Sequence, residues 1–263
     1  MLFYASSFGV AVLAVFGKTR WALLLVTFLL PLRNVVEKLQ QFPLGNQLID
    51  ILIGGVLLGW ALSFTSKNKK FLERSSLNVI SIFLIIYTCA SFGIGSEYLK
   101  EHDLFVVDSS RLGDCKNFCL LPVLFFLTLN NITDKKWVWR IFTAMCLSMT
   151  LVAYYTVDQI SWYSSLLSRA KITGTFQFLG PNEVAAFLNQ YTIILMSVYF
   201  FMKRGWPKLL LLALVFINLY CVLFLYSRGA YLGLAAGMFI LFAFKNKKLL
   251  IPLILILVLW QAA

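Results

Sequence analysis

The chain has 263 residues, of which 60% are hydrophobic and 13% charged, and its mean hydropathy is +0.84. Soluble domains are roughly half apolar and a quarter charged, so this chain has too few polar side chains to cover a soluble fold. The composition also excludes a disordered chain, a collagen and a disulfide scaffold, and it predicts an integral membrane protein. The net charge of +12 would suggest nucleic acid in a soluble protein. Here it indicates orientation, because Lys and Arg collect on the cytoplasmic side of membrane proteins, and no nucleic-acid partner is expected.

Apolar stretches recur along the whole chain. A helix needs about 20 mostly apolar residues to cross the hydrocarbon core. We therefore expect an all-α, polytopic transmembrane helical bundle that forms a single membrane domain over residues 1–263. Its membrane segments, about ten in number, are 2–17, 21–32, 48–65, 77–95, 118–130, 141–157, 184–202, 209–226, 229–244 and 249–263. The stretch 21–32 is the weakest, because it is short and contains Pro31, and it also fits a re-entrant piece or half of a tight hairpin.

The charges sort into two sets when the connections are assigned alternately to the two sides of the membrane. One set carries 15 basic and two acidic residues, and it comprises 18–20, 66–76, 131–140, 203–208 and 245–248. The other carries 8 basic and 9 acidic residues, and it comprises 33–50, 96–117, 158–183 and 227–229. The positive-inside bias places the first set in the cytoplasm. We therefore expect the N-terminus and the loops 96–117 and 158–183 outside, so that any chemistry occurs at the outer face.

The cysteines and the single histidine predict neither a metal site nor a cofactor. Three cysteines lie in apolar stretches, where free Cys behaves as a small hydrophobe: Cys89, Cys146 and Cys221. Cys115 and Cys119 are four residues apart, a helical spacing that rarely allows a disulfide. His102 stands alone in an acidic loop, and a zinc site needs several ligands. Nucleotide-binding and soluble-hydrolase motifs are absent from the sequence.

The outer segment 169–183, RAKITGTFQFLGPNE, combines bases, two glycines and a Pro-Asn turn just before the stretch 184–202. Asn182 is expected to cap the helix that follows. A helix N-terminus that faces outward favours an anionic ligand. The alternative is a loop followed by a capped helix with no ligand.

The second outer feature is the tight turn 226–230, which contains Arg228. So short a turn places Arg228 at or just inside the outer interface, where an arginine usually has a partner or a function. Its planar fork suits phosphate, and the alternative is an arginine that snorkels to lipid headgroups. Glycines recur every fourth residue from this turn and predict close packing of another helix: Gly229, Gly233 and Gly237.

Further polar residues lie near these two segments. Asn189 and Gln190 are about two turns into the stretch 184–202, where amides usually face the bundle interior or a polar cavity. Asp158 lies at an outer helix end and is a candidate partner for Arg169 or Arg228.

Two motifs in this order resemble a known family. KITGTFQFLGPNEVAAFL, followed one hairpin later by LYSRGAYLGLAAG, resembles the core of the bacterial O-antigen ligase/polymerase superfamily over about residues 169–240. The segment 31–53 resembles the early part of such proteins more weakly. The matching residues are Gly174, Pro181, Asn182, Ser227, Arg228 and Gly229.

The resemblance implies a multi-pass glycosyltransferase of the bacterial inner membrane. Such proteins take a glycan from undecaprenyl diphosphate at the periplasmic face and join it to a lipid or glycan acceptor, without a metal or cofactor. The resemblance implies that Arg228, with Lys171 or Arg169, holds the diphosphate. Lys171 stands where the family often has an arginine, and it keeps the charge but lacks the bidentate fork. No residue is identified as the catalytic base.

The family usually continues with a long outer loop that carries a functional His and Arg, and then with closing helices. This chain stops at Ala263, so the resemblance implies a C-terminally incomplete member. Two alternatives stay open: a lipid-linked glycan transporter or flippase, and an inactive truncated membrane protein or scaffold.

Overall fold

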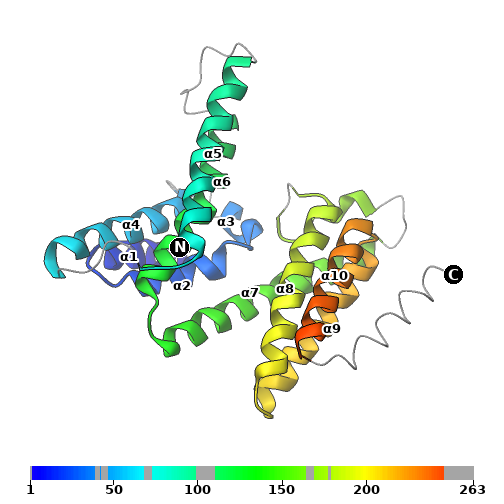
Figure 1. Cartoon of the computed structure of the whole chain (residues 1–263). Helices are drawn as coiled ribbons and strands as arrows, with labels where there is room; N and C mark the ends of the chain where they lie inside the picture. Colours follow the sequence, from blue (N-terminus) through cyan, green and yellow to red (C-terminus); the bar gives the residue numbers. More distant parts are fainter. Residues whose placement is uncertain are drawn as a thin grey trace. The chain divides into compact units, whose positions relative to one another are not determined.

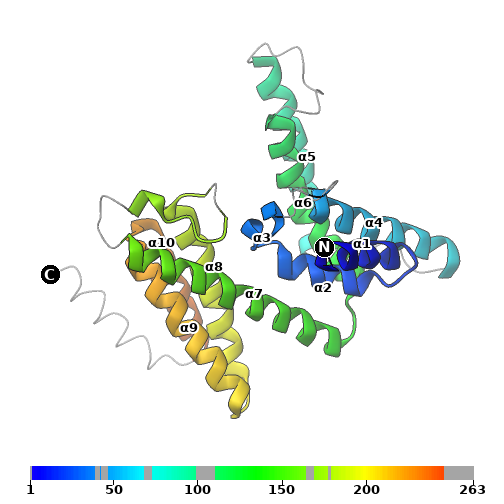
Figure 2. The same cartoon turned by 180° about the vertical axis from the view of Figure 1, so that it is seen from behind.

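A computed structural model describes residues 2–38, 42, 47–67, 73–98, 110–163, 169–176 and 179–245 (Figures 1 and 2). Within these ranges the regular elements are helices and no strand occurs, which confirms the all-α prediction. The chain divides into two units, Met1–Thr27 with Phe42–Phe142 and Phe28–Gln41 with Thr143–Ala263. The prediction of a single membrane domain is untested by this division, and each unit is described by itself.

The first unit contains α1 (Leu2–Val15), most of α2 (Thr19–Leu29), α4 (Leu48–Lys67), α5 (Leu77–Tyr98), α6 (Ser110–Asn131) and the first residues of α7 (Lys135–Trp162). Helix α4 packs in parallel along α1 through small residues. A Cβ on Gly55 would lie 2.7 Å from the Ala11 carbonyl oxygen, and one on Gly59 would overlap the Ala14 carbonyl. Two backbones approach this closely only where one of them carries no side chain.

The second unit contains α3 (Arg33–Lys38), the rest of α7, the short 3₁₀ helix η2 (Arg169–Lys171), α8 (Pro181–Phe201), α9 (Trp206–Phe224) and α10 (Arg228–Lys245). Helices α8, α9 and α10 lie side by side in both views (Figures 1 and 2). The glycine row of α10 packs against α8. A Cβ on Gly233 would lie 2.8 Å from Nδ2 of Asn189, and one on Gly237 would overlap the Ile193 side chain. The predicted close approach of a helix to this row is confirmed.

Six helices in the described part of the chain are long and apolar enough to cross a membrane. They are Leu77–Gly95, Leu112–Asn131, Lys135–Trp162, Pro181–Phe201, Trp206–Phe224 and Arg228–Lys245. Many of their large apolar side chains are exposed, as is expected of surfaces that face lipid. The chain is a multi-pass helical membrane protein.

The six spanning helices are fewer than the predicted count of about ten. Phe3–Val15, Thr19–Leu29 and Leu48–Ser63 are apolar but shorter. Helix α2 has 11 residues and ends before Pro31. It rises only about 16 Å, against about 30 Å of hydrocarbon. The predicted segment 249–263 lies outside the described residues.

Helices α6 and α7 extend well beyond their predicted apolar stretches. Helix α6 starts at Ser110 rather than at 118, and α7 covers Lys135–Trp162 rather than 141–157. Hydropathy detects only the part of a helix that hydrocarbon surrounds. The 28 residues of α7 rise about 42 Å, which matches a bilayer with its headgroup regions.

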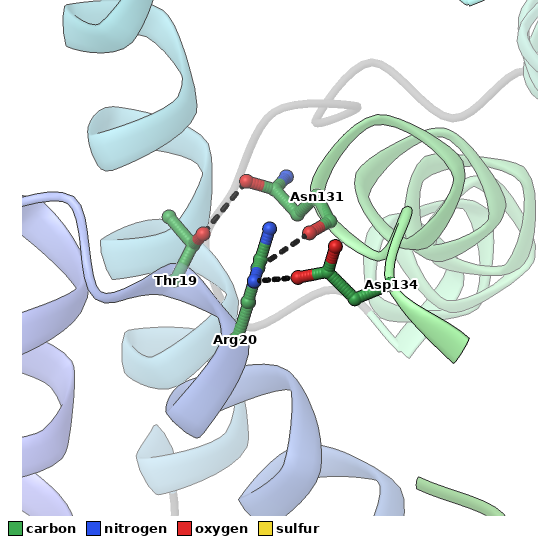
Figure 3. A network of polar contacts seen from close by, with 4 residues as sticks. All are labelled: Thr19, Arg20, Asn131 and Asp134. Carbon is green, nitrogen blue, oxygen red and sulfur yellow. Dashed lines mark hydrogen bonds and ion pairs between the residues drawn. The ribbon is translucent and has the colours of Figure 1, made fainter. Parts of the chain in front are cut away.

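Polar contacts in the first unit join connections that the charge analysis assigned to the same set. At one end of the first unit, Arg20 Nε donates to the Asn131 carbonyl at 3.0 Å and its guanidinium pairs with Asp134 (Figure 3). The Thr19 hydroxyl donates to Oδ1 of Asn131 at 2.7 Å (Figure 3). These contacts join connections 18–20 and 131–140, both assigned to the inner side. Connections 33–50 and 96–117, both assigned to the outer side, are joined by the ion pair of Lys116 with Asp50 at 2.7 Å.

Candidate anion-binding site

The segment 169–176 is a folded turn that Gln159 holds at the end of α7. Gly174 has a φ of +58°, in the left-handed region that favours glycine. The backbone N–H groups of Thr173 and Gly174 donate to Oε1 of Gln159 at 2.9 and 2.8 Å. Nε2 of Gln159 donates back to the Gly174 carbonyl at 3.2 Å. One amide side chain therefore satisfies three backbone groups, and Gly174 acts by allowing this turn.

Thr175 connects the same turn to Pro31 and Asn34, which belong to the same unit. Its side chain is fully buried, and its hydroxyl donates to the Pro31 carbonyl at 2.6 Å. The Asn34 N–H donates to the Thr175 carbonyl at 3.0 Å. Phe176 is buried next to it and meets the Phe187 ring of α8 edge-on, with the ring centroids 4.8 Å apart. These contacts fix the segment, and therefore η2, against the helices.

Helix α8 begins with Gly180 as its N-cap residue and Pro181 in its first turn. Pro at the first helical position leaves no N–H to satisfy there, and no side chain makes a cap hydrogen bond. The prediction that Asn182 caps this helix is wrong, because Asn182 already lies inside it. Its Oδ1 instead accepts a hydrogen bond from the Arg169 guanidinium at 2.7 Å. Asn182 therefore holds one of the predicted phosphate-binding bases in place.

The turn between α9 and α10 places Arg228 at the start of α10. Tyr226 has a φ of 50°, in the left-handed region, and it is the middle one of the three residues between α9 and α10. Ser227 is buried, and its carbonyl accepts from the Tyr231 N–H at 3.1 Å in the first turn of α10. Arg228 is the first residue of that helix, and its side chain is exposed. Its guanidinium has no hydrogen bond or ion pair with any residue of the described ranges.

The two segments meet at one pocket of about 620 Å³. Its lining residues are Arg169, Asn182, Ala186, Tyr226, Ser227, Arg228, Gly229 and Ala230. The first turns of α8 and α10 both contribute, so two helix N-termini border the pocket beside two guanidinium groups. Helix N-termini carry partial positive charge, and none of the described lining residues is acidic, although Glu183 lies in the first turn of α8. The arrangement suits an anion with several oxygens, such as a phosphate or diphosphate.

The other predicted residues lie around this pocket rather than in its lining. The Lys171 ammonium sits over the Tyr163 ring, 5.6 Å from its centroid. Gly174 and Pro181 shape the backbone on either side. Asp158 makes no ion pair with Arg169 or Arg228 in the described ranges, so its suggested pairing is not observed.

Asn189 lies beneath the pocket and connects α8 to α10. It is buried, and its Nδ2 donates to the carbonyl of Ala230, a lining residue, at 3.2 Å. Its Oδ1 is buried without a hydrogen-bond partner. The expectation that Asn189 faces the bundle interior is confirmed, whereas Gln190 is exposed.

The contributions of Gln159 and Thr175 are not apparent from the sequence. A glutamine at the end of an apolar stretch has many possible partners, and the bond from Thr175 to Pro31 joins residues 144 positions apart. Gly174 was the one nearby residue that indicated a turn, and it did not indicate which side chains stabilise that turn. The predicted loop around His102 lies outside the described residues.

Comparisons with known proteins give no match: no family model, no curated protein and no solved structure matches this chain.

Proposed function

We propose that this chain is a membrane glycosyltransferase of the O-antigen ligase or polymerase type. It binds an undecaprenyl-diphosphate-linked glycan in the pocket of Arg169 and Arg228, and it transfers the glycan to a hydroxyl of a lipid or glycan acceptor. The observation that carries the proposal is the pocket itself. Two arginines from separate segments line one pocket, and none of its described lining residues is acidic.

The proposed role of the pocket is electrostatic. When the bond from glycan to diphosphate breaks, negative charge grows on the departing diphosphate, and preorganised donors stabilise that charge. Arg228 supplies a guanidinium without a partner among the described residues, and Arg169 supplies one that Asn182 orients. The first turns of α8 and α10 add backbone dipoles. Lys171, on the same short helix as Arg169, adds positive charge nearby.

The proposal places the protein in the bacterial inner membrane with the pocket on the periplasmic side. Supporting it, the pocket lies between connections 158–183 and 227–229, which belong to the set that is poor in basic residues. In this arrangement the shorter apolar helices enter the membrane beside the six spanning helices, and the predicted tenth segment, 249–263, lies outside the described residues.

Glycan transfer in cells tests this function. In a strain that lacks the gene, the wild-type protein restores transfer from the carrier to the acceptor, and Arg228→Ala does not. Arg204→Ala is the matched control, because it removes an exposed arginine from connection 203–208 at the other end of α8. Unchanged transfer by Arg228→Ala would refute the proposed role. Carrier-linked glycan trapped on the inner face of the deletion strain would instead indicate a flippase.

A further inference from the structure

Three cysteines converge between α5 and α6. The sulfur atoms of Cys89, Cys115 and Cys119 all lie within 4.8 Å of one another, and all three thiols are free. Cys115 and Cys119 are one helical turn apart on α6 and therefore lie on the same face, which here is turned towards Cys89 of α5. The helix packing thus assembles a cluster that the spacing in the sequence does not reveal.

The three residues lie at matching depths in the two spanning helices. Cys89 comes six residues before Gly95, where the apolar part of α5 ends, and Cys119 comes seven residues after Leu112, where that of α6 begins. At 1.5 Å per residue both are about 10 Å inside the same end of the hairpin. Cys115 is one turn nearer that end. Free cysteines placed at random in two helices would rarely reach one common point.

We propose that Cys89, Cys115 and Cys119 form a binding site for a thiophilic metal ion, Cu(I). Three sulfurs around one ion at about 2.3 Å are about 4 Å apart, so a small adjustment of side-chain rotamers brings the three thiols to coordination distance. Thiolates select soft ions, and Cu(I) accepts three ligands, whereas structural Zn(II) sites almost always have four. In the described ranges no His, Asp or Glu joins the cluster as a fourth ligand. Each thiol that binds as a thiolate releases its proton to water.

The charge of such a site depends on how many of its thiols lose a proton. Cu(I) with one thiolate and two thiols is neutral, whereas three thiolates would leave a net charge of −2, which is costly in a largely apolar setting. Lys116, which neighbours Cys115, is already paired with Asp50 at 2.7 Å. The carboxylate of Asp50 therefore balances the positive charge of Lys116, which reduces its repulsion of a bound cation.

A competition titration of the full chain in detergent tests the site. Under anaerobic conditions with a non-thiol reductant, the wild-type protein should withdraw one Cu(I) per chain from a chromogenic Cu(I) chelator. Cys89→Ser, Cys115→Ser and Cys119→Ser should each weaken binding at least about tenfold, because each removes a ligand. Cys146→Ser is the matched control, a free cysteine of α7 outside the cluster, and should bind as the wild type does.

Measurements on the wild-type protein keep the test decisive if a variant fails to fold. X-ray absorption should show a shell of sulfur atoms alone at about 2.3 Å. Cu(I) should also protect the three cluster cysteines, but not Cys146, from alkylation mapped by peptide mass spectrometry. Wild-type binding no tighter than that of the triple Ser variant would overturn the proposal. So would a disulfide within the cluster in the native protein, or tighter retention of Zn(II) than of Cu(I).

Discussion

The surroundings of the Arg228 guanidinium are the strongest indication of an anionic ligand. Arg228 begins a membrane-spanning helix, lines a pocket and makes no ion pair with the described residues. A charged group at the edge of hydrocarbon is costly unless something compensates it. Snorkelling to lipid headgroups compensates an isolated arginine. It does not explain a second arginine in the same pocket that is held there by Asn182.

Arg169 and Lys171 differ in role although they are two residues apart on η2. Arg169 faces the pocket, whereas Lys171 faces Tyr163. The resemblance pointed first to Lys171, because it occupies the position of a family arginine. We propose Arg169 as the diphosphate ligand because it lines the pocket, and a guanidinium can donate two parallel hydrogen bonds to a phosphate.

Gly174→Ala should destabilise the protein by about 1–3 kcal/mol. The alanine would be strained at a φ of +58°, and its Cβ would lie 3.2 Å from the Thr156 hydroxyl. Reversible unfolding in mixed micelles measures the free energy of unfolding. Gly9→Ala is the control, because a Cβ there meets nothing within 4 Å. Equal stability of the Gly174 variant and the wild type would contradict the described turn.

At the scale of elements, the packing of α10 on α8 depends on the absence of side chains at Gly233 and Gly237. These positions bring the first turn of α10 towards that of α8, and both turns border the pocket. The glycine row therefore has a structural role that also sets the geometry of the site.

Gly237→Ala should cost about 1–3 kcal/mol of unfolding free energy, because the added methyl group overlaps Ile193. Ile193→Ala in the same chain should restore part of that loss by opening space. A double-mutant cycle in micelles measures the coupling of the two residues. Additive effects of the two substitutions would show that they do not meet.

The helices themselves were largely predictable, because apolar runs of sufficient length report burial in lipid directly. The starts of α6 and α7 were missed since their first turns are polar: Ser110 and Lys135 lie outside the apolar stretches. The sequence also predicted Arg169, Asn182 and Arg228 as site residues, and all three line the pocket. It could not say that Asn182 orients Arg169, because that contact depends on how η2 folds back onto α8.

The cysteine cluster shows the same limit more clearly. Cys115 and Cys119 share a helical face by their spacing, which the sequence reveals. That Cys89 lies opposite depends on the register of α5 against α6, and no local pattern encodes that register. The sequence therefore predicted no metal site where three sulfurs meet.

At the scale of the whole molecule, the net charge of +12 is explained by the predicted orientation of the chain in the membrane. Contacts join connections that belong to the same charge set: Arg20 pairs with Asp134 in the set predicted to face the cytoplasm, and Lys116 pairs with Asp50 in the set predicted to face outward. The set predicted to face outward has 8 basic and 9 acidic residues, and the two arginines of the pocket belong to it.

Reporter fusions test which side each connection faces. A reporter that is active only outside the cytoplasm should be active when fused within 158–183 or at 227–229, and inactive at 203–208. A fluorescent protein that folds only in the cytoplasm should give the reverse pattern. A cytoplasmic signal at either pocket connection would contradict the proposed outer-face site.

The most direct test of the central claim is the dissociation constant of undecaprenyl diphosphate for the purified full chain. A charge-assisted hydrogen bond contributes about 1.5–3 kcal/mol, so Arg228→Ala and Arg169→Ala should each weaken binding by about 10- to 100-fold. Undecaprenol, which lacks the diphosphate, should bind the wild type and both variants alike, and Arg204→Ala should bind undecaprenyl diphosphate as the wild type does. If both pocket variants bound the diphosphate as tightly as the wild type, the pocket would not be its binding site.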